Sequence, residues 1–503
     1  MKLSARDKRK IPGLSLVSSS LSLVLLISLP LTASGQTHQH EHQSDHPDHH
    51  GHETAAMTAT VIGGPFRTML ALGSGTALQP ASTPMWAWHA MLGEWAMMVH
   101  AEIKTGFNYQ TKPRGVGKAE SANWFMTMAE RDIGPGRLML RGMFSAEPLT
   151  APHRGFPQLF QIGETYRNRP IVDAQHPHDL LMELAASYTV PLSDQISIQV
   201  YGGPVAEPAL GPVAFMHRAS AAENPAPPLG HHLQDSTHIS HGVVTGALTI
   251  SRFKLEASRF RGREPDEDRV GIDLGGFDSY SFRAWFTPTP NWAAQFSYGR
   301  LKNPEAVHAG DLIRKTVSIT YYRPLPQNGN WSSTLVWGRN DESHGDENSY
   351  LFESALQFKD KNHFYTRLEL VDKKGLLISN IFGRPGLPTE PLLQSISIAD
   401  AIALSRPLGK LLRNPGIMTA EVHPDPNFID FEIYNKALRV GAFTFGGVRD
   451  LVSPAQFRIG LGTDVTFYHL PSIPRFPLLF DQIYSQRPLS FHFFVRFRLG
   501  NSK

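Results

Sequence analysis

The chain has 503 residues, of which 41% are hydrophobic and 18% are charged, and its formal net charge is +3. Apart from one short run near the N-terminus it has no basic cluster, so we expect no nucleic-acid partner. Cysteine is absent, which excludes disulfide bonds and a lipid-modified N-terminal cysteine.

A secretory signal peptide is predicted for residues 1–35. Four basic residues between Arg6 and Lys10 precede an apolar stretch at 14–31, and small residues follow at 32–35. The alternative is an uncleaved membrane anchor. No later segment approaches the about 18 to 20 consecutive apolar residues that a spanning helix requires. We therefore expect the mature chain to be secreted or to cross a membrane as β-strands.

The predicted elements after the leader fall into three parts. Residues 36–60 are polar and histidine-rich and are expected to be a disordered periplasmic tail. Residues 61–93 contain Gly, Pro and short apolar pieces and are expected to be a periplasmic lead-in. Residues 94–500 are expected to form an outer-membrane β-barrel.

Alternating apolar and polar residues predict about sixteen strands in residues 94–500. The first fifteen are expected near 95–109, 124–128, 138–147, 182–190, 196–200, 240–250, 253–263, 280–286, 292–298, 317–321, 331–337, 350–358, 364–370, 437–448 and 456–468. The last is expected at 490–499, where odd positions from Phe491 to Leu499 are apolar and His492, Arg496 and Arg498 are polar. One face of such a strand suits hydrocarbon and the other suits water.

The predicted connections alternate between short and long. Short links are expected at 132–136, 191–195, 251–253, 287–291, 324–330, 359–363 and 449–455, and long ones at 149–178, 204–239, 264–278, 373–436 and 469–488. Short periplasmic turns, long outer loops and an even strand number are typical of outer-membrane barrels. The predicted fold class is therefore an all-β, antiparallel transmembrane barrel of about sixteen strands. Fourteen or eighteen strands, or a large secreted all-β protein, are the alternatives.

Histidines suggest two candidate metal sites, because neutral imidazole suits Cu(II) and Zn(II). The first set lies in the tail: His38, His40, His42, His46, His49, His50 and His52. The second set lies in the outer loops: His176, His178, His231, His232 and His238. We expect that the tail can bind Cu or Zn and that no cofactor is required. The alternative use of the second set is to hold the outer loops in place by ordinary hydrogen bonds.

Charged residues on the polar faces are expected to line the barrel interior. In hydrocarbon at mid-depth, Arg or Lys would each cost about 2 to 4 kcal/mol. The candidates are Glu102, Lys104, Arg141, Glu183, Arg283, Glu353, Arg367, Glu369, Arg458, Asp464, Arg496 and Arg498. They would tune selectivity or pair across the lumen.

Two loops are candidates for closing the pore. The loop 204–239 is apolar and proline-rich, so it is expected to fold against other residues, and one alternative is a constriction inside the lumen. The loop 373–436 contains a possible short amphipathic helix at 395–412, which would plug or cover the mouth. A hydrolase is a minor alternative, because Ser236 and His238, and Ser240 and His241, are only neighbours in sequence.

The segments 211–242 and 262–267 resemble stretches of uncharacterised, porin-like outer-membrane barrel proteins of Gram-negative bacteria. The resemblance extends over roughly 75–500 and implies location and architecture, without a substrate or functional residue. We expect a porin-like channel for small polar solutes, with metal binding by the tail. The alternative is a barrel that captures metal and forms no channel. Membrane lipid, small polar solutes and metal ions are the expected partners, and the oligomeric state is left open.

Overall fold

The computed structural model describes residues 72–167, 170–306, 310–343, 345–376, 378–380, 430–432, 437–471, 481 and 484–500. The chain divides into two units, Met1–Ala59 and Thr60–Lys503, and all described residues belong to the second. The predicted signal peptide, the histidine-rich tail and nearly all of the loop 373–436 lie outside the described residues.

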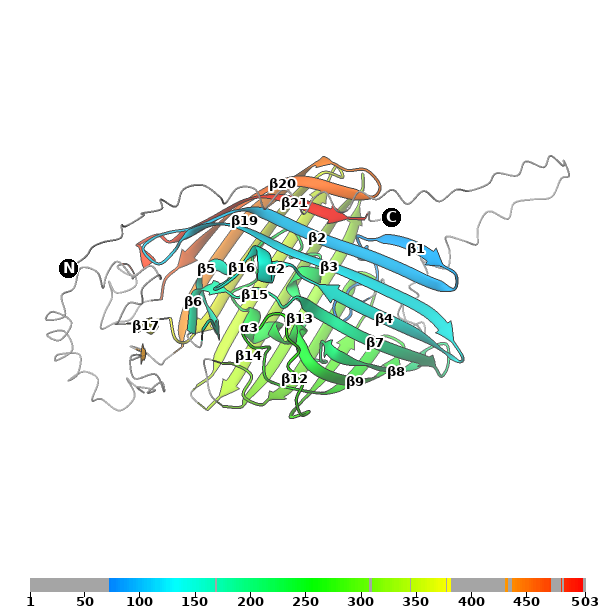
Figure 1. Cartoon of the computed structure of the whole chain (residues 1–503). Coiled ribbons are helices and arrows are strands. Elements are labelled where there is room, and N and C mark those ends of the chain that lie inside the picture. Colours follow the sequence, from blue (N-terminus) through cyan, green and yellow to red (C-terminus); the bar gives the residue numbers. More distant parts are fainter. Residues whose placement is uncertain are drawn as a thin grey trace, which may run out of the picture. The chain divides into compact units, whose positions relative to one another are not determined.

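The described chain forms a closed antiparallel barrel of sixteen strands, so the predicted fold class and strand number are confirmed (Figure 1). The strands are β2 (Trp95–Gln110), β3 (Gly117–Ile133), β4 (Gly136–Phe144), β7 (Leu181–Pro191), β8 (Ile196–Ala206), β9 (Ser240–Ile250), β10 (Phe253–Phe260), β11 (Ser279–Phe286), β12 (Trp292–Leu301), β13 (Leu312–Leu325), β14 (Gly329–Glu342), β15 (Glu347–Phe358), β16 (Asn362–Lys373), β19 (Leu438–Val452), β20 (Phe457–His469) and β21 (Leu489–Leu499). Strand β21 pairs with β2 from Glu102↔Arg498 to Gln110↔Ser490, which closes the barrel.

The remaining elements are short. Strand β1 (Trp88–Leu92) pairs with the start of β2, and β5 (Phe156–Thr165) pairs with β6 (Pro170–Gln175). Strand β17 (Ile378–Asn380) pairs with β18 (Asp430–Glu432). The helical turns are α2 (Glu147–Thr150), η2 (Phe215–His217), α3 (His231–Gln234) and η3 (Ser236–His238). Among the described residues, no helix has the length and apolar character needed to cross a membrane.

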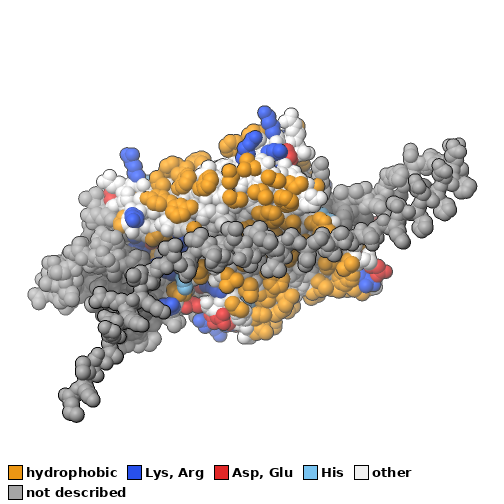
Figure 2. Space-filling model, turned by 45° about the horizontal axis from the view of Figure 1, so that its top comes forward, with side chains coloured by type: hydrophobic (Ala, Val, Ile, Leu, Met, Phe, Trp, Pro, Cys, Tyr) orange, Lys and Arg blue, Asp and Glu red, His pale blue; other side chains and the backbone are white. Residues whose placement is uncertain are grey.

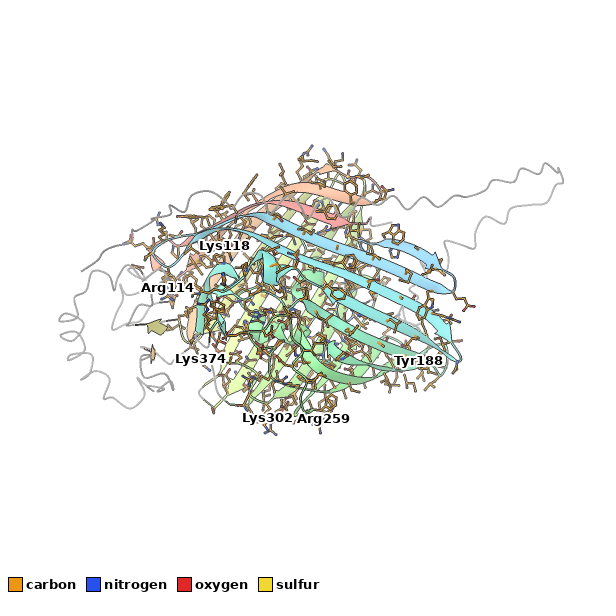
Figure 3. The ribbon with its side chains drawn as sticks, in the orientation of Figure 1. Arg114, Lys118, Tyr188, Arg259, Lys302 and Lys374 are labelled. Atoms are coloured by element: carbon orange, nitrogen blue, oxygen red, sulfur yellow. The ribbon has the colours of Figure 1, made fainter. Side chains whose placement is uncertain are left out.

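The two ends of the barrel differ, as the sequence predicts. At one end, here the turn end, consecutive strands are joined by short turns at residues 134–135, 192–195, 251–252, 287–291, 326–328, 359–361 and 453–456. At the other end, here the loop end, lie the connections 145–180, 207–239 and 261–278. Arg114 and Lys118 lie toward the loop end with the β5–β6 hairpin, and Tyr188 lies toward the turn end (Figure 3). Lys118 Nζ donates to the Gly155 carbonyl at 2.6 Å, which ties the loop to β3.

The outer surface of the barrel is apolar on all sixteen strands. Large exposed apolar side chains, one from each strand, are Phe107, Phe125, Leu140, Leu184, Val200, Val244, Leu255, Phe282, Phe296, Ile319, Leu335, Leu356, Phe364, Phe445, Leu461 and Phe493. Figure 2 shows such hydrophobic side chains gathered over the visible wall. Soluble monomers rarely expose so continuous an apolar surface.

Part of the interior is apolar as well, which corrects the expectation of a wet lumen lined by polar residues. The methionines Met98, Met126, Met128, Met139, Met143 and Met182 point inward and are buried in one apolar cluster. Among these, Met126 and Met128 belong to the strand predicted near 124–128, where they are alternating apolar positions. Methionine fills irregular gaps in a packed core as readily as it faces lipid, so alternation alone did not separate the two.

Candidate functional site in the barrel lumen

The segment 207–239, here called the inner segment, folds into the lumen. It connects β8 to β9 and is buried along nearly its whole length. This is the arrangement that the sequence left as one alternative for the loop 204–239. The apolar and proline-rich composition suits it, because a chain packed inside a barrel needs few solvated side chains.

Serine hydroxyls of the wall hold the start of the inner segment. The backbone amides of Ala209 and Gly211 donate to Ser258 Oγ at 2.8 Å and Ser297 Oγ at 2.9 Å. Arg283 of β11 donates to the Gly211 carbonyl at 3.1 Å. Buried backbone groups outside regular structure need such partners, so the wall is built to receive this segment.

The middle of the inner segment contacts the opposite strands. The hydroxyls of Ser220 and Thr334, the latter on β14, lie 2.7 Å apart. Arg367 of β16 donates to the Ala226 carbonyl at 2.7 Å. The inner segment therefore reaches from β10 across the lumen to β16.

Two wall glycines allow the inner segment to approach closely. A Cβ atom on Gly338 of β14 would lie 2.3 Å from the Leu233 carbonyl oxygen, and one on Gly299 of β12 would lie 2.8 Å from a Leu210 methyl carbon. A contact below 3.0 Å with a backbone atom cannot be relieved by a side-chain rotation. Any larger residue at Gly338 would displace α3.

Buried ion pairs fix the inner segment most strongly. Glu223 contacts Arg496, Arg498 and His363, with Oε1 3.0 Å from Arg498 Nη1 and 3.2 Å from His363 Nδ1. Burial alone would raise the pKa of the Glu223 carboxyl, but the two arginines outweigh it and hold the pKa well below its usual range. Glu223 is therefore a charged anchor for the inner segment on β21 and β16.

A second ionic anchor joins the inner segment to itself and to β15. Arg218 bonds Asp235 at 2.8 Å and Glu353 at 3.0 Å. Burial opposes ionisation of Asp235, yet Arg218 and His231 together hold the pKa of this carboxyl below its usual range. Because both acids are almost fully buried, removing either would leave the buried guanidinium with a single carboxylate partner, which destabilises the anchor.

Two further segments enter the lumen. Residues 72–87, expected as part of a periplasmic lead-in, enter from the turn end, where the Ser82 amide donates to the Pro290 carbonyl at 2.9 Å. Lys254 of β10 donates to the Thr76 carbonyl at 2.8 Å, so this stretch lies inside the barrel. The β5–β6 hairpin lies inside the loop end, and there Lys373 donates to Gln161 Oε1 at 2.6 Å.

The space left in the lumen includes three small cavities. The largest is about 80 Å³, lies beside residues 83–86 at the turn end and is also lined by His100 and His217. The others are about 40 Å³ and about 20 Å³. Because a water molecule needs roughly 10 to 15 Å³ by this measure, the largest cavity has room for several waters and the smallest for about one.

The three cavities share lining residues and so follow one another through the lumen. The first two share Glu102, Trp124 and Met216. The second and third share His176, His178 and His231. The third reaches residues 264–269 of the loop end, so the series extends from one end of the barrel toward the other.

The twelve residues expected to line the interior all lie on the lumenal side of the wall. Eleven are buried and Lys104 is partly buried: the buried ones are Glu102, Arg141, Glu183, Arg283, Glu353, Arg367, Glu369, Arg458, Asp464, Arg496 and Arg498. Most pair within the wall or with the inner segment. Arg141 bonds Glu183 at 3.1 Å and Arg367 bonds Glu353 at 2.9 Å. Among the described residues, these charged side chains therefore do not form an open ring around a wide pore.

The loop histidines expected to bind metal lie close together. The ring centroids of His178 and His238 are 5.3 Å apart, those of His238 and His231 5.2 Å, those of His231 and His232 5.4 Å, and those of His232 and His176 5.9 Å. Nevertheless, within the described ranges no group of three or more His, Asp or Glu side chains is arranged to hold a metal ion. The seven tail histidines lie outside these ranges.

Burial lowers the pKa of five loop imidazoles, those of His176, His217, His231, His232 and His238. It lowers the pKa of His231 and His232 to about 4 and that of His238 to about 3. It also lowers the pKa of His176 and His217 well below the usual range. A neutral imidazole keeps a lone pair on one ring nitrogen and can act as a metal ligand.

The serine and histidine neighbours considered for a hydrolase do not bond to each other. Ser236 Oγ accepts a hydrogen bond from Arg314 at 2.7 Å, and Ser240 Oγ donates to the Thr237 carbonyl at 3.0 Å. His238 Nδ1 lies 2.8 Å from the Asp235 carbonyl oxygen. These pairs therefore lack the hydroxyl–imidazole contact of a nucleophile and its base.

Two lumenal histidines were missing from the predicted site. His100 lies on β2 and His217 in η2, with ring centroids 5.8 Å apart, and Trp124 lies 4.9 Å from each. His100 was only one of several polar residues on an alternating strand. Nothing in the sequence relates it to a loop 117 residues further along, so the pair could be found only in the folded chain.

Comparisons with known proteins gave solved structures only. No family model and no curated protein matches the chain. The similar structures include an anion-selective porin from Comamonas acidovorans (10% identity, TM-score 0.41, 81% of this chain and 100% of that chain) and Salmonella typhi OmpF in complex with daunomycin (8%, 0.45, 82% and 100%). OmpT of Vibrio cholerae is also similar (6%, 0.40, 82% and 100%). TM-scores below 0.5 at such identities carry no information on function.

Proposed function

We propose that this protein is a barrel of the Gram-negative outer membrane that conducts ions and very small polar solutes through a lumen narrowed by the inner segment. The observation that carries the location is the apolar outer surface on all sixteen strands. A closed barrel with that surface satisfies its backbone internally and presents hydrocarbon-like side chains to lipid. The turn end would then face the periplasm and the loop end the exterior.

The filled lumen supports narrow conduction. A sixteen-stranded barrel has room for an aqueous channel, yet here the inner segment, residues 72–87 and the β5–β6 hairpin occupy the interior. Cavities of about 80, 40 and 20 Å³ suit water and small ions better than sugars or amino acids.

The test is ion conductance of the purified full chain in a planar bilayer. A variant in which residues 212–238 are replaced by a short Gly-Ser linker is measured beside it. We expect a small K⁺ current from the full chain and a current at least fivefold larger from the shortened variant. Equal currents would contradict the narrowing by the inner segment, and a chain that stays soluble and monodisperse without detergent would contradict the membrane location.

The second candidate is a barrel that captures metal without forming a channel. The observation that favours it is the dense ionic packing around Glu223 and Arg218, which holds the inner segment in place. This candidate predicts no current from the full chain at any voltage. Calorimetric titration with Cu(II) or Zn(II), comparing the full chain with one lacking residues 36–60, measures what the tail contributes.

A further inference from the structure

A series of histidine rings follows the linked cavities. His100 and His217 line the first cavity, and His176, His178 and His231 line both the second and the third. His238 lines the third. The centroids of neighbouring imidazole rings lie 5.2–5.9 Å apart in the pairs His100–His217, His178–His238, His231–His238, His231–His232 and His176–His232. Met216, next to His217 in η2, lines both the first and the second cavity, so the two groups of rings lie along adjoining cavities.

Two of the cavity-lining rings have a nitrogen that makes no hydrogen bond. The Nε2 atoms of His100 and His238 are buried without a hydrogen-bond partner among the described residues. His100 is only 3% exposed. Burying a polar nitrogen without a partner costs free energy, so both nitrogens are positioned to bind a ligand that enters their cavity.

Acidic side chains outnumber basic ones along the cavities. Six carboxyl groups line them, namely Glu102, Glu147, Glu164, Asp179, Glu223 and Glu264. Three cationic side chains oppose them, namely Lys104, Arg269 and Arg498. Burial raises the pKa of Glu164 and Glu264, so these two add acceptor oxygens rather than full negative charges. A large solute does not fit the volume.

We propose that the linked cavities are a route for borderline transition-metal cations, Cu(II), Zn(II) or Ni(II), which pass between successive imidazoles along the inner segment. This proposal rests on the proposed function and names its substrate class. Imidazole nitrogen prefers these ions to Ca²⁺ and Mg²⁺, which prefer oxygen ligands.

Conduction requires sites that bind well enough for entry and weakly enough for release. Three or four converging ligands would retain a metal ion, whereas single imidazoles spaced along a path would pass it on.

The experiment uses the full chain in lipid vesicles that enclose a fluorescent zinc indicator. Zn(II) influx is measured beside Ca(II) influx and beside K⁺ conductance in planar bilayers. We compare the wild type with His217→Leu, with His238→Gln and with the control His153→Leu, whose ring is exposed and lines none of the three cavities. Influx, not binding, is the readout, because metal held by the tail histidines alone would register as binding without any influx.

We expect Zn(II) influx to exceed Ca(II) influx about tenfold. The ratio of Zn(II) influx to K⁺ conductance is expected to fall about tenfold in both route variants and to stay unchanged in the control. A K⁺ current with equal Zn(II) and Ca(II) influx, or with ratios unchanged in the route variants, overturns the route and leaves the proposed channel standing. Absence of current for every ion overturns the channel and the route together.

A second measurement does not depend on folding of a variant. Micromolar Zn(II) added to the wild-type channel is expected to reduce its K⁺ current at least twofold, because a resident metal ion occupies the narrow route. Added Ca(II) at the same concentration is the control. A K⁺ current that Zn(II) leaves unchanged overturns the proposal.

Discussion

Replacement of Glu223 by Gln should release the inner segment. Glu223 is 5% exposed and is held by Arg496, Arg498 and His363. Removing one partner of a buried ion pair costs about 3 to 5 kcal/mol when the other charge is left without compensation; here Arg496 keeps Asp450 and Arg498 keeps Glu102, so we expect the lower end, about 3 kcal/mol. Since about 1.4 kcal/mol is a factor of ten, the closed arrangement should lose about two orders of magnitude of its advantage over an open one.

The assay is single-channel K⁺ current of the wild type and of Glu223→Gln in planar bilayers, together with thermal unfolding in detergent. The matched control is Asp464→Asn. Asp464 is an equally buried carboxylate, bonded to His492 at 2.7 Å and to Tyr365 at 2.8 Å, and all three residues belong to the wall. Both variants should unfold at lower temperature, but only Glu223→Gln should spend more time in a high-conductance state. The reasoning is refuted if the two variants show the same current as the wild type while both lose stability.

Three further predictions concern separate features of the barrel. Gly338→Val should raise the K⁺ current, because its Cβ would meet the Leu233 carbonyl oxygen and displace α3. The control is Gly246→Val, where a Cβ has open space. Equal currents from the two variants would contradict the close packing of the inner segment against β14. Phe296→Arg on the exposed face of β12 should weaken refolding into lipid vesicles by about 2 to 4 kcal/mol, measured by urea titration, and no loss would mean that this face does not meet hydrocarbon. Burial lowers the pKa of His238 to about 3, so the neutral ring contributes stability that is present above the unfolded pKa of 6.5 and is lost as pH falls. Between pH 7.5 and 5 the wild type should therefore lose about 2 kcal/mol of unfolding free energy relative to His238→Leu. A difference in unfolding free energy that is independent of pH would contradict the neutral buried ring.

The strands and their connections could be predicted because they depend on local signals. Turn residues such as those at 134–135 and 287–291 separate segments of alternating polarity. Within each segment, the apolar positions identify the face that contacts lipid. The sixteen strands of the structure follow these segments, including those predicted near 240–250 and 253–263, which form β9 and β10. Alternation reports the faces of a strand directly, so the wall needs no knowledge of distant residues.

The content of the lumen could not be predicted in the same way. Glu223 and Arg496 form one of its main ion pairs although they are 273 residues apart in sequence. The inward methionines, such as Met126, look like lipid-facing residues because packing against the inner segment and packing against lipid demand the same side chains. The proline-rich composition of 204–239 indicated a packed loop, but only the wall glycines and arginines determine where it packs.

The central claim is that the inner segment lies inside the barrel, and a cysteine cross-link tests it most directly. The chain has no cysteine, so Ser220→Cys and Thr334→Cys would be its only thiols, at positions whose hydroxyls lie 2.7 Å apart. In vesicles, mild oxidation should form the disulfide in most molecules, and before oxidation both thiols should resist a bulky maleimide–polyethylene glycol reagent. Rapid labelling of both cysteines without disulfide formation would contradict the account.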